Sequence, residues 1–180
     1  MKPLRSIWRI LLLFCIICLS CNEKSKQASK IEATTDSELT AIQETIDGLY
    51  ESIHVDKGEV ADLDQLLAHF APDARLGSVK EGKADLKTAI EYFEGWEAAM
   101  KEIRPDLLKE WEINGKSQYF GNIAYHTSHY GVYFNSTEEM AEQGIINYQL
   151  VKIGGDWKVI SMIWHAENPE YKIPSNYFSN

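Results

Sequence analysis

The sequence predicts an α+β domain in which three helices come first and a run of antiparallel strands follows. Two observations lead to this fold class. Apolar residues recur at helical spacing over about residues 39–103, and the chain after residue 108 consists of long β-type segments separated by turn residues. Consecutive strands joined by short turns favour an antiparallel meander, and helices are needed to cover one of its faces.

The first 21 residues have the pattern of an export signal. Three basic residues precede the apolar run 10–19, and the segment ends on Leu-Ser-Cys at Cys21. The run is shorter than the roughly 20 apolar residues that a membrane-spanning helix needs. We therefore expect a lipoprotein whose signal, residues 1–20, is removed and whose Cys21 is acylated, for example with palmitate. The alternative is a secreted protein in which Cys21 lies there by chance.

The rest of the chain divides into a polar linker, residues 21–35, and one domain, residues 36–180. Asn22 follows Cys21 where an aspartate would signal retention in the inner membrane, so an outer-membrane anchor is favoured within the cell envelope. All three cysteines lie at or before Cys21. The domain therefore has no disulfide, no thiol for catalysis and no cysteine for a metal site.

The charge of the chain excludes one class of partner. The formal net charge is −9 at pH 7, and removing the predicted signal takes away three positive charges and no negative one, which leaves −12. No stripe of basic and aromatic residues is present. We therefore expect no binding to nucleic acid.

Proline and glycine residues set the limits of the predicted helices. Pro72 follows the second helix and Pro105 follows the third, and each stops the helix before it. The predicted elements before residue 105 are a helix over 39–53, a helix over 60–70, a weak strand over 73–79, a turn at 81–82 and a helix over 84–103.

Four strands are predicted after residue 108, over 110–120, 122–135, 143–153 and 156–166. Gly154-Gly155 predicts a tight hairpin between the last two. Asn114-Gly115 and Gly121-Asn122 both resemble hairpin turns, but they are too close together for both to join long strands. We favour the turn at Gly121-Asn122 and a bulge or kink at Gly115.

Several short motifs, in this order and at this spacing, resemble the SnoaL-like branch of the nuclear transport factor 2-like (NTF2-like) superfamily over about residues 39–169. The motifs are LLAHFAPDA at 66–74, Gly82 with the helix after it, GNIAY at 121–125, Gly144, and GDWKVI at 155–160. The resemblance implies a cone-shaped cavity between a curved antiparallel sheet and the N-terminal helices. It also implies dimerisation through the outer face of the sheet, so a homodimer is expected.

The resemblance does not imply one reaction, because the superfamily includes isomerases, dehydratases, epoxide hydrolases, polyketide cyclases and many proteins that are not enzymes. Many SnoaL-like proteins carry a histidine six residues after the closing tryptophan and a serine two residues beyond it. Here Ile163 and His165 hold those positions. The family's catalytic histidine is therefore not transferred, and enzyme activity stays open.

Ser161 and His165 are candidate site residues on the last strand. Regular alternation places them on the same face as Trp157. If that face looks into the cone, His165 lies at its mouth, where a neutral imidazole can act as a general base and Glu167 can orient it. The alternative is a histidine on the rim with a satisfied hydrogen bond.

His126 and Asp73 are the other catalytic candidates. Alternation points His126 and His129 to opposite faces, so the pair is a poor metal site, and we predict neither a metal nor a cofactor. Asp73 follows Pro72 and could act as a proton shuttle, although a turn residue is its more ordinary role.

Tyr92, Trp96 and Tyr148 are candidate ligand-binding residues, because large rings can line a pocket for an apolar or aromatic molecule. The more ordinary interpretation is that they are core residues. The sequence thus favours a membrane-anchored domain that binds a small hydrophobic or aromatic ligand. The alternatives are a non-enzymatic interaction module of the envelope, or an enzyme of the isomerase or dehydratase type.

Overall fold

The computed structural model describes residues 35, 37–80 and 82–179. The chain divides into two compact units, residues 1–38 and 39–180, and the description below concerns the second. The predictions for the signal at 1–20, for Cys21 and for the linker lie outside the described residues.

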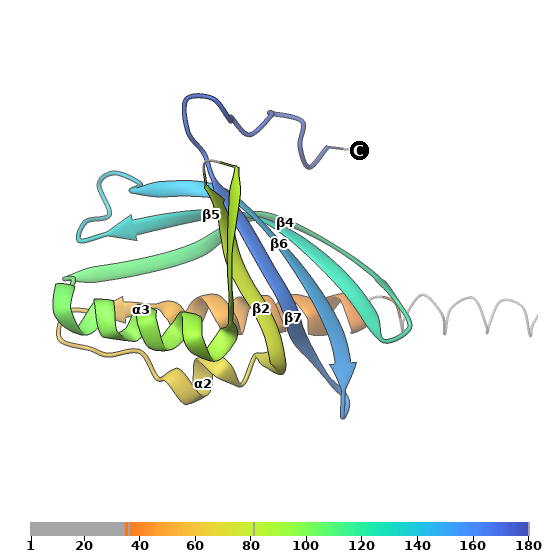
Figure 1. Cartoon of the computed structure of the whole chain (residues 1–180). Helices are drawn as coiled ribbons and strands as arrows, with labels where there is room; N and C mark the ends of the chain where they lie inside the picture. The colour runs from red at the N-terminus through yellow and green to blue at the C-terminus, as the bar shows by residue number, and fades with distance from the viewer. Residues whose placement is uncertain (1–34, 36, 81, 180) are drawn as a thin grey trace, which may run out of the picture. The chain divides into compact units, whose positions relative to one another are not determined.

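One curved sheet of seven strands forms the larger part of the domain, in the order β1-β4-β5-β6-β7-β2-β3 (Figure 1). The strands from β4 to β7 form the predicted antiparallel meander, and β2 pairs with β7 in parallel. The α+β fold class is confirmed. The strands are β1 (Val55–Asp56), β2 (Phe70–Lys80), β3 (Lys83–Thr88), β4 (Leu107–Phe120), β5 (Ile123–Phe134), β6 (Glu142–Ile153) and β7 (Asp156–Ala166).

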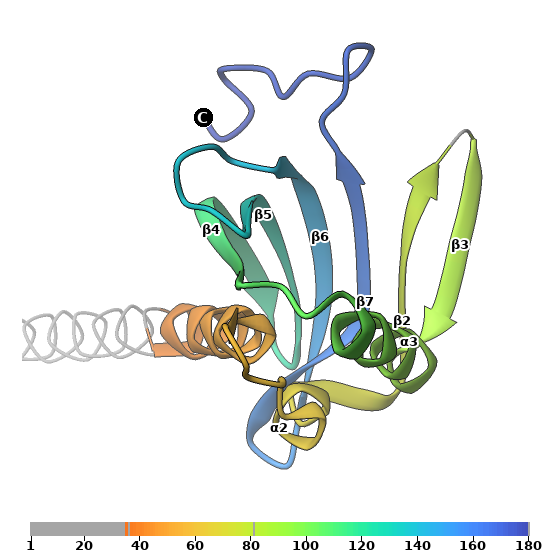
Figure 2. The same ribbon diagram turned by 90° about the vertical axis from the view of Figure 1, so that its left-hand side faces the viewer.

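The helices lie together on one side of the sheet, which bends over them (Figure 2). Within this unit they are a first helix over residues 39–53, α2 (Leu63–Leu67) and α3 (Ala89–Ile103). Ile42, Ile46 and Leu49 of the first helix are fully buried against the sheet. None of the helices among the described residues is long and apolar enough to span a bilayer.

The second and third helices are shorter than predicted. The second ends at Leu67, because Phe70 already pairs with Val159 of β7 as part of β2. The third begins at Ala89 rather than Ala84, because residues 83–88 form a hairpin with β2. The side chain and backbone of Thr88 form a capping box with Glu91, which fixes the start of α3 at this point.

Both preferred turns of the meander are confirmed, and the bulge in β4 lies close to its predicted position. β4 ends before Gly121, and Gly154 and Gly155 both have positive φ, at 65° and 104°. The register of β4 against β5 shifts between Glu112 and Asn114, which makes Ile113 the extra residue. The bulge therefore lies two positions before Gly115.

A second bulge, at Ile160 in β7, overturns the regular alternation predicted for the last strand. Val159 pairs with Leu150, and Ser161 pairs with the next residue, Gln149. One extra residue reverses the order of the faces from this point onward. The residues of β7 on the helix side are therefore Trp157, Val159, Met162 and Trp164, whereas Ser161, Ile163 and His165 lie on the outer side.

Two glycines test how tightly the sheet and α3 are packed. A Cβ at Gly144 would collide with the backbone of His165 and Ala166, whereas a Cβ at Gly95 in α3 would meet open space. We expect Gly144→Ala to lower the free energy of unfolding by about 1–3 kcal/mol, through overpacking. We expect Gly95→Ala to raise it by about 0.5–1 kcal/mol, because alanine favours the helix. Chemical denaturation measures both, and equal effects would contradict the described packing.

Candidate functional site

A cavity of about 120 Å³ lies between the sheet, the first helix and α3. Aromatic and aliphatic side chains form most of its wall, and two carboxyl groups interrupt it. The lining residues are Leu49, Ile53, Tyr92, Phe93, Trp96, Glu110, Tyr130, Glu142, Ile146, Tyr148, Met162 and Trp164. This cone cavity corresponds to the cavity that the resemblance implies.

The two carboxyl groups of the cone cavity come from strands on either side of β5. Glu110 of β4 and Glu142 of β6 both pair with Val132, so the three residues form one row across the sheet. Residues in one row point to the same face of a sheet. The hydroxyl of Tyr130 donates a hydrogen bond of 2.8 Å to Glu142 Oε1.

Burial changes the acidity of groups on the cavity wall. Burial, and then the negative charge of Glu142, raise the pKa of Glu110 to about 7. Burial, and then the negative charge of Glu110, raise the pKa of Tyr92 to about 12. Glu110 can therefore take up or release a proton near neutral pH, as general acids and bases do.

Four aromatic rings follow one another along the wall. Trp164 and Tyr92 have ring centroids 5.3 Å apart, Tyr92 and Phe93 5.1 Å, and Phe93 and Trp96 6.3 Å. The interplanar angles are 76°, 87° and 85°, so neighbouring rings are nearly perpendicular. Such a wall presents ring faces as well as ring edges.

Tyr148 adds a buried polar group to this apolar wall. Its side chain is 1% exposed, and its hydroxyl interacts with the hydroxyl of Tyr50. The hydroxyl of Tyr50 also shares a hydrogen bond of 2.7 Å with Ser128. Burial raises the pKa of Tyr148 well above its usual value, so this hydroxyl stays protonated.

A separate polar network lies beside the cone cavity and does not line it. His126 is fully buried, with Nε2 2.5 Å from Glu112 Oε2 and Nδ1 2.7 Å from Ser117 Oγ. Burial alone would raise the pKa of Glu112, but hydrogen bonds from His126, Ser128 and Gln43 outweigh it and hold that pKa below the usual value. The β4 bulge places Gly115 beneath the Glu112 carboxylate, where any side chain would collide with it. This network ties the first helix to the bulge.

Three of the predicted ligand-binding residues, Tyr92, Trp96 and Tyr148, line the cone cavity. Ser161 and His165 do not, because the bulge at Ile160 turns them to the outer side of the sheet. The ring of His165 lies 5.1 Å from that of Tyr171, in an open hollow on that side.

The remaining candidates lie away from the cone cavity. His126 is in the neighbouring network, and Asp73 is exposed in β2. His126 and His129 point to opposite faces, as the alternation predicts. His126 is buried on the helix side, and His129 is hydrogen-bonded at 3.1 Å to Gln143 on the outer side. Within the described residues, no group of three or more His, Cys, Asp or Glu side chains is placed to hold a metal ion.

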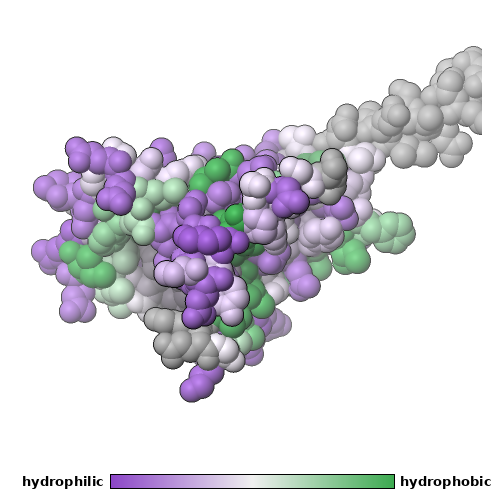
Figure 3. Space-filling model, turned by 90° about the horizontal axis from the view of Figure 1, so that it is seen from above, coloured by the Kyte–Doolittle hydropathy of each residue, from purple (hydrophilic) through white to green (hydrophobic). Residues whose placement is uncertain are grey.

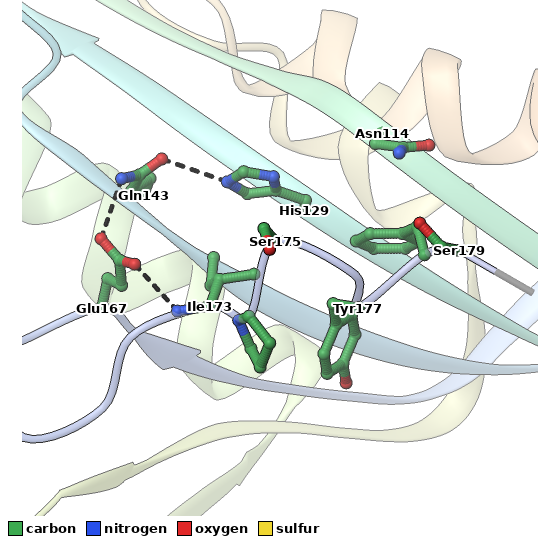
Figure 4. Close-up of a pocket in the computed structure, with 10 residues that line it drawn as sticks. Asn114, His129, Gln143, Glu167, Ile173, Ser175, Tyr177 and Ser179 are labelled. Carbon is green, nitrogen blue, oxygen red and sulfur yellow. Dashed lines mark hydrogen bonds between the residues drawn. The ribbon is translucent and has the colours of Figure 1, made fainter.

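The outer side carries a pocket of about 350 Å³ beneath the C-terminal segment, residues 167–179 (Figure 4). Gln143 links His129 to Glu167, whose other carboxylate oxygen accepts a hydrogen bond from the backbone N–H of Ile173. These bonds hold the segment against the sheet. Seen from above, this end of the molecule is mostly hydrophilic, with hydrophobic side chains in narrower strips (Figure 3).

Sequence reasoning missed Glu110 and Glu142, which are the charged groups of the cone cavity. Glu142 follows the acidic loop after β5, where solvated surface is the default expectation. Strand alternation could have indicated that Glu110 faces inward. Leu108, Glu110 and Glu112 share a face, and Leu108 belongs to the core. Recognising Glu142 required the register that places it in the row of Glu110.

Comparisons with solved structures agree with this fold. A "Putative Scytalone Dehydratase" from Novosphingobium aromaticivorans is 16% identical, with a TM-score of 0.60, and the match covers 79% of this chain and 93% of that chain. A protein of unknown function with a cystatin-like fold from Nostoc punctiforme is 22% identical, with a TM-score of 0.58, covering 72% and 91%. An NTF2-like protein of unknown function from Shewanella baltica is 18% identical, with a TM-score of 0.50, covering 73% of this chain and 95% of that chain.

No protein-family model and no curated protein matches the sequence. The chain has the NTF2-like fold.

The raised pKa of Glu110 predicts a pH-dependent cost in stability. Its folded pKa is about 7 and its reference value is 4.5, so the cost is absent below about pH 4.5, grows as the pH rises, and is complete above about pH 7. We expect Glu110→Gln to unfold with a free energy about 1–3 kcal/mol higher than the parent protein at about pH 8. This gain should vanish at about pH 4.5. Urea denaturation across this range measures it, and a gain that does not change with pH would contradict the assignment.

Proposed function

We propose that this NTF2-like domain binds a small molecule with an apolar or aromatic body in the cone cavity. The cavity itself is the observation that supports this most directly. Protein interiors are close-packed, whereas a partly open space of about 120 Å³ remains here between the sheet, the first helix and α3. An apolar cavity of about 150 Å³ is large enough to take benzene. The ligand is therefore about the size of one ring.

The cavity also argues against a purely structural role for the domain. Tyr92, Trp96, Tyr148 and Trp164 could have filled the cone completely, and they leave a space between them instead. That space is bordered by two carboxyl groups and three tyrosines, and a binding site uses a few polar groups of this kind to orient a ligand.

Acid–base catalysis in the same cavity is the second candidate function, and the Glu110 carboxyl favours it. A carboxyl group with a pKa of about 7 can donate and accept a proton at neutral pH, which isomerisation and dehydration both require. In this function Glu110 is the acid or base, and Tyr130 fixes Glu142 beside it. The similarity to the structure named as a scytalone dehydratase supports the same chemistry.

An interaction module remains the candidate from another class. Phe120, Ile123 and Tyr125, at the β4–β5 turn, are 84%, 60% and 47% exposed. Together with Ile160 they border an apolar hollow. An exposed apolar surface of this kind favours contact with another protein chain, and a second copy of this chain is the partner that we propose. Dimerisation there would leave the cone cavity accessible, so it is compatible with ligand binding.

The ligand proposal predicts that binding stabilises the folded protein. A screen of apolar and monocyclic aromatic compounds should contain some that raise the melting temperature. At about 100 times its Kd, a ligand adds about 2.7 kcal/mol. Ile146→Phe fills the cavity and should abolish the shift, because Ile146 is 2% exposed on its wall. Ile90→Phe is the matched control, since Ile90 is 49% exposed on α3. A complete screen without a shift would exclude the proposal.

We also propose that Cys21 carries the lipid that anchors the domain to an envelope membrane, with the outer membrane favoured. The motif Leu-Ser-Cys after the apolar run supports this. Cells fed labelled palmitate should label the protein, and Cys21→Ser should remove the label and release the protein from the membrane fraction. Ser25→Ala, in the predicted linker, is the control and should leave labelling unchanged. Labelling that survives Cys21→Ser would exclude this anchor.

A further inference from the structure

The charged groups on the wall of the cone cavity are all negative. Glu110 and Glu142 line it, and no Lys, Arg or His belongs to the twelve described residues around it. Glu142 already accepts a hydrogen bond from Tyr130. Among the described residues, no hydrogen bond or ion pair joins the Glu110 carboxylate to another side chain. Burial and the charge of Glu142 therefore act on it without compensation.

The aromatic wall favours the same kind of partner. Aromatic ring faces are electronegative, and a cation is attracted to them, most strongly to tryptophan. Trp96 and Trp164 stand at the two ends of the ring series that Tyr92 and Phe93 connect. A cation in the cavity can thus contact ring faces and a carboxylate together.

From these observations we infer that the cone cavity selects a small amine in its cationic form, with a body of about one ring. This inference rests on the proposed ligand-binding function and names its ligand class. An alkylammonium group supplies up to three donors, and the Glu110 carboxylate can accept them. The net charge of −9 also attracts cations to the protein.

Other ligand charges fit this wall less well. An anion would add a further negative charge beside Glu110 and Glu142 and face the negative ring faces. A neutral ligand would leave the carboxylate of Glu110 without a partner, so that group would have to stay protonated. Binding of an ammonium ion instead favours the ionised carboxylate. The proton of Glu110 is then released to the buffer near neutral pH.

Three ring-sized probes that differ in charge test the inference, namely benzylamine, benzyl alcohol and benzoate. Calorimetry on the purified protein at about pH 8, above the Glu110 pKa of about 7, compares their affinities. We expect benzylamine to bind at least about 10-fold more tightly than benzyl alcohol, and benzoate to bind most weakly. Near pH 7, titrations in two buffers of different ionisation enthalpy should show proton release with benzylamine.

Two variants test whether Glu110 gives the cavity its preference for a cation. Glu110→Gln should lower the affinity for benzylamine by about 10-fold and leave that for benzyl alcohol within about 2-fold. Glu94→Gln is the matched control, an exposed glutamate on α3, and should change neither affinity. Proton release by the parent protein tests the same assignment if Glu110→Gln does not fold.

The outcomes distinguish this inference from the proposed function. Benzyl alcohol binding as tightly as benzylamine, or benzoate binding most tightly, would overturn the selection of a cation and leave ligand binding in place. Benzylamine binding without proton release near pH 7 would also overturn it. Failure of all three probes, together with an empty wider screen, would overturn the ligand-binding function as well.

Discussion

Two β-bulges decide which side chains of this sheet face the helices. Ile113 is an extra residue in β4 and shifts the alternation of faces by one position. Glu110 and Glu112 therefore face inward before the bulge, and Gly115 and Ser117 face inward after it. The extra residue Ile160 does the same in β7, where it brings Met162 and Trp164 to the helix side. Without these bulges, Trp164 would leave the cone cavity and the Glu112 network could not close. The ligand site depends on both irregularities.

The cone cavity combines features that cost stability. Glu110 is held beside Glu142, in surroundings that disfavour its charge. A domain selected for stability alone would replace these groups with apolar side chains, since unpaired buried polar groups are costly. The network of Glu112, His126 and Ser117 is different, because its members satisfy one another. The proposed binding and proton-transfer roles therefore concern Glu110, whereas His126 belongs to a self-contained network outside the cone cavity.

The meander could be predicted from sequence because its turns have strong local signals, such as Gly154-Gly155 and Gly121-Asn122. The strand β3 could not, since Leu86 fits the helical spacing of the residues after it and only pairing with Gly77 reveals a strand. The aromatic candidates Tyr92, Trp96 and Tyr148 do line the cavity, whereas one inserted residue in β7 displaced Ser161 and His165. Glu110 and Glu142 are separated by more than thirty residues and meet only through register.

The most direct measurement of this account is an NMR titration of the side-chain carboxyl carbon of Glu110, with Glu110→Gln used to assign the signal. We predict a pKa of about 7, because burial and the charge of Glu142 oppose ionisation. Saturation with benzylamine should lower this value, since an ammonium ion stabilises the carboxylate. A pKa near the reference value of 4.5 without ligand would contradict the account, because Glu110 would then be an ordinary solvated carboxylate.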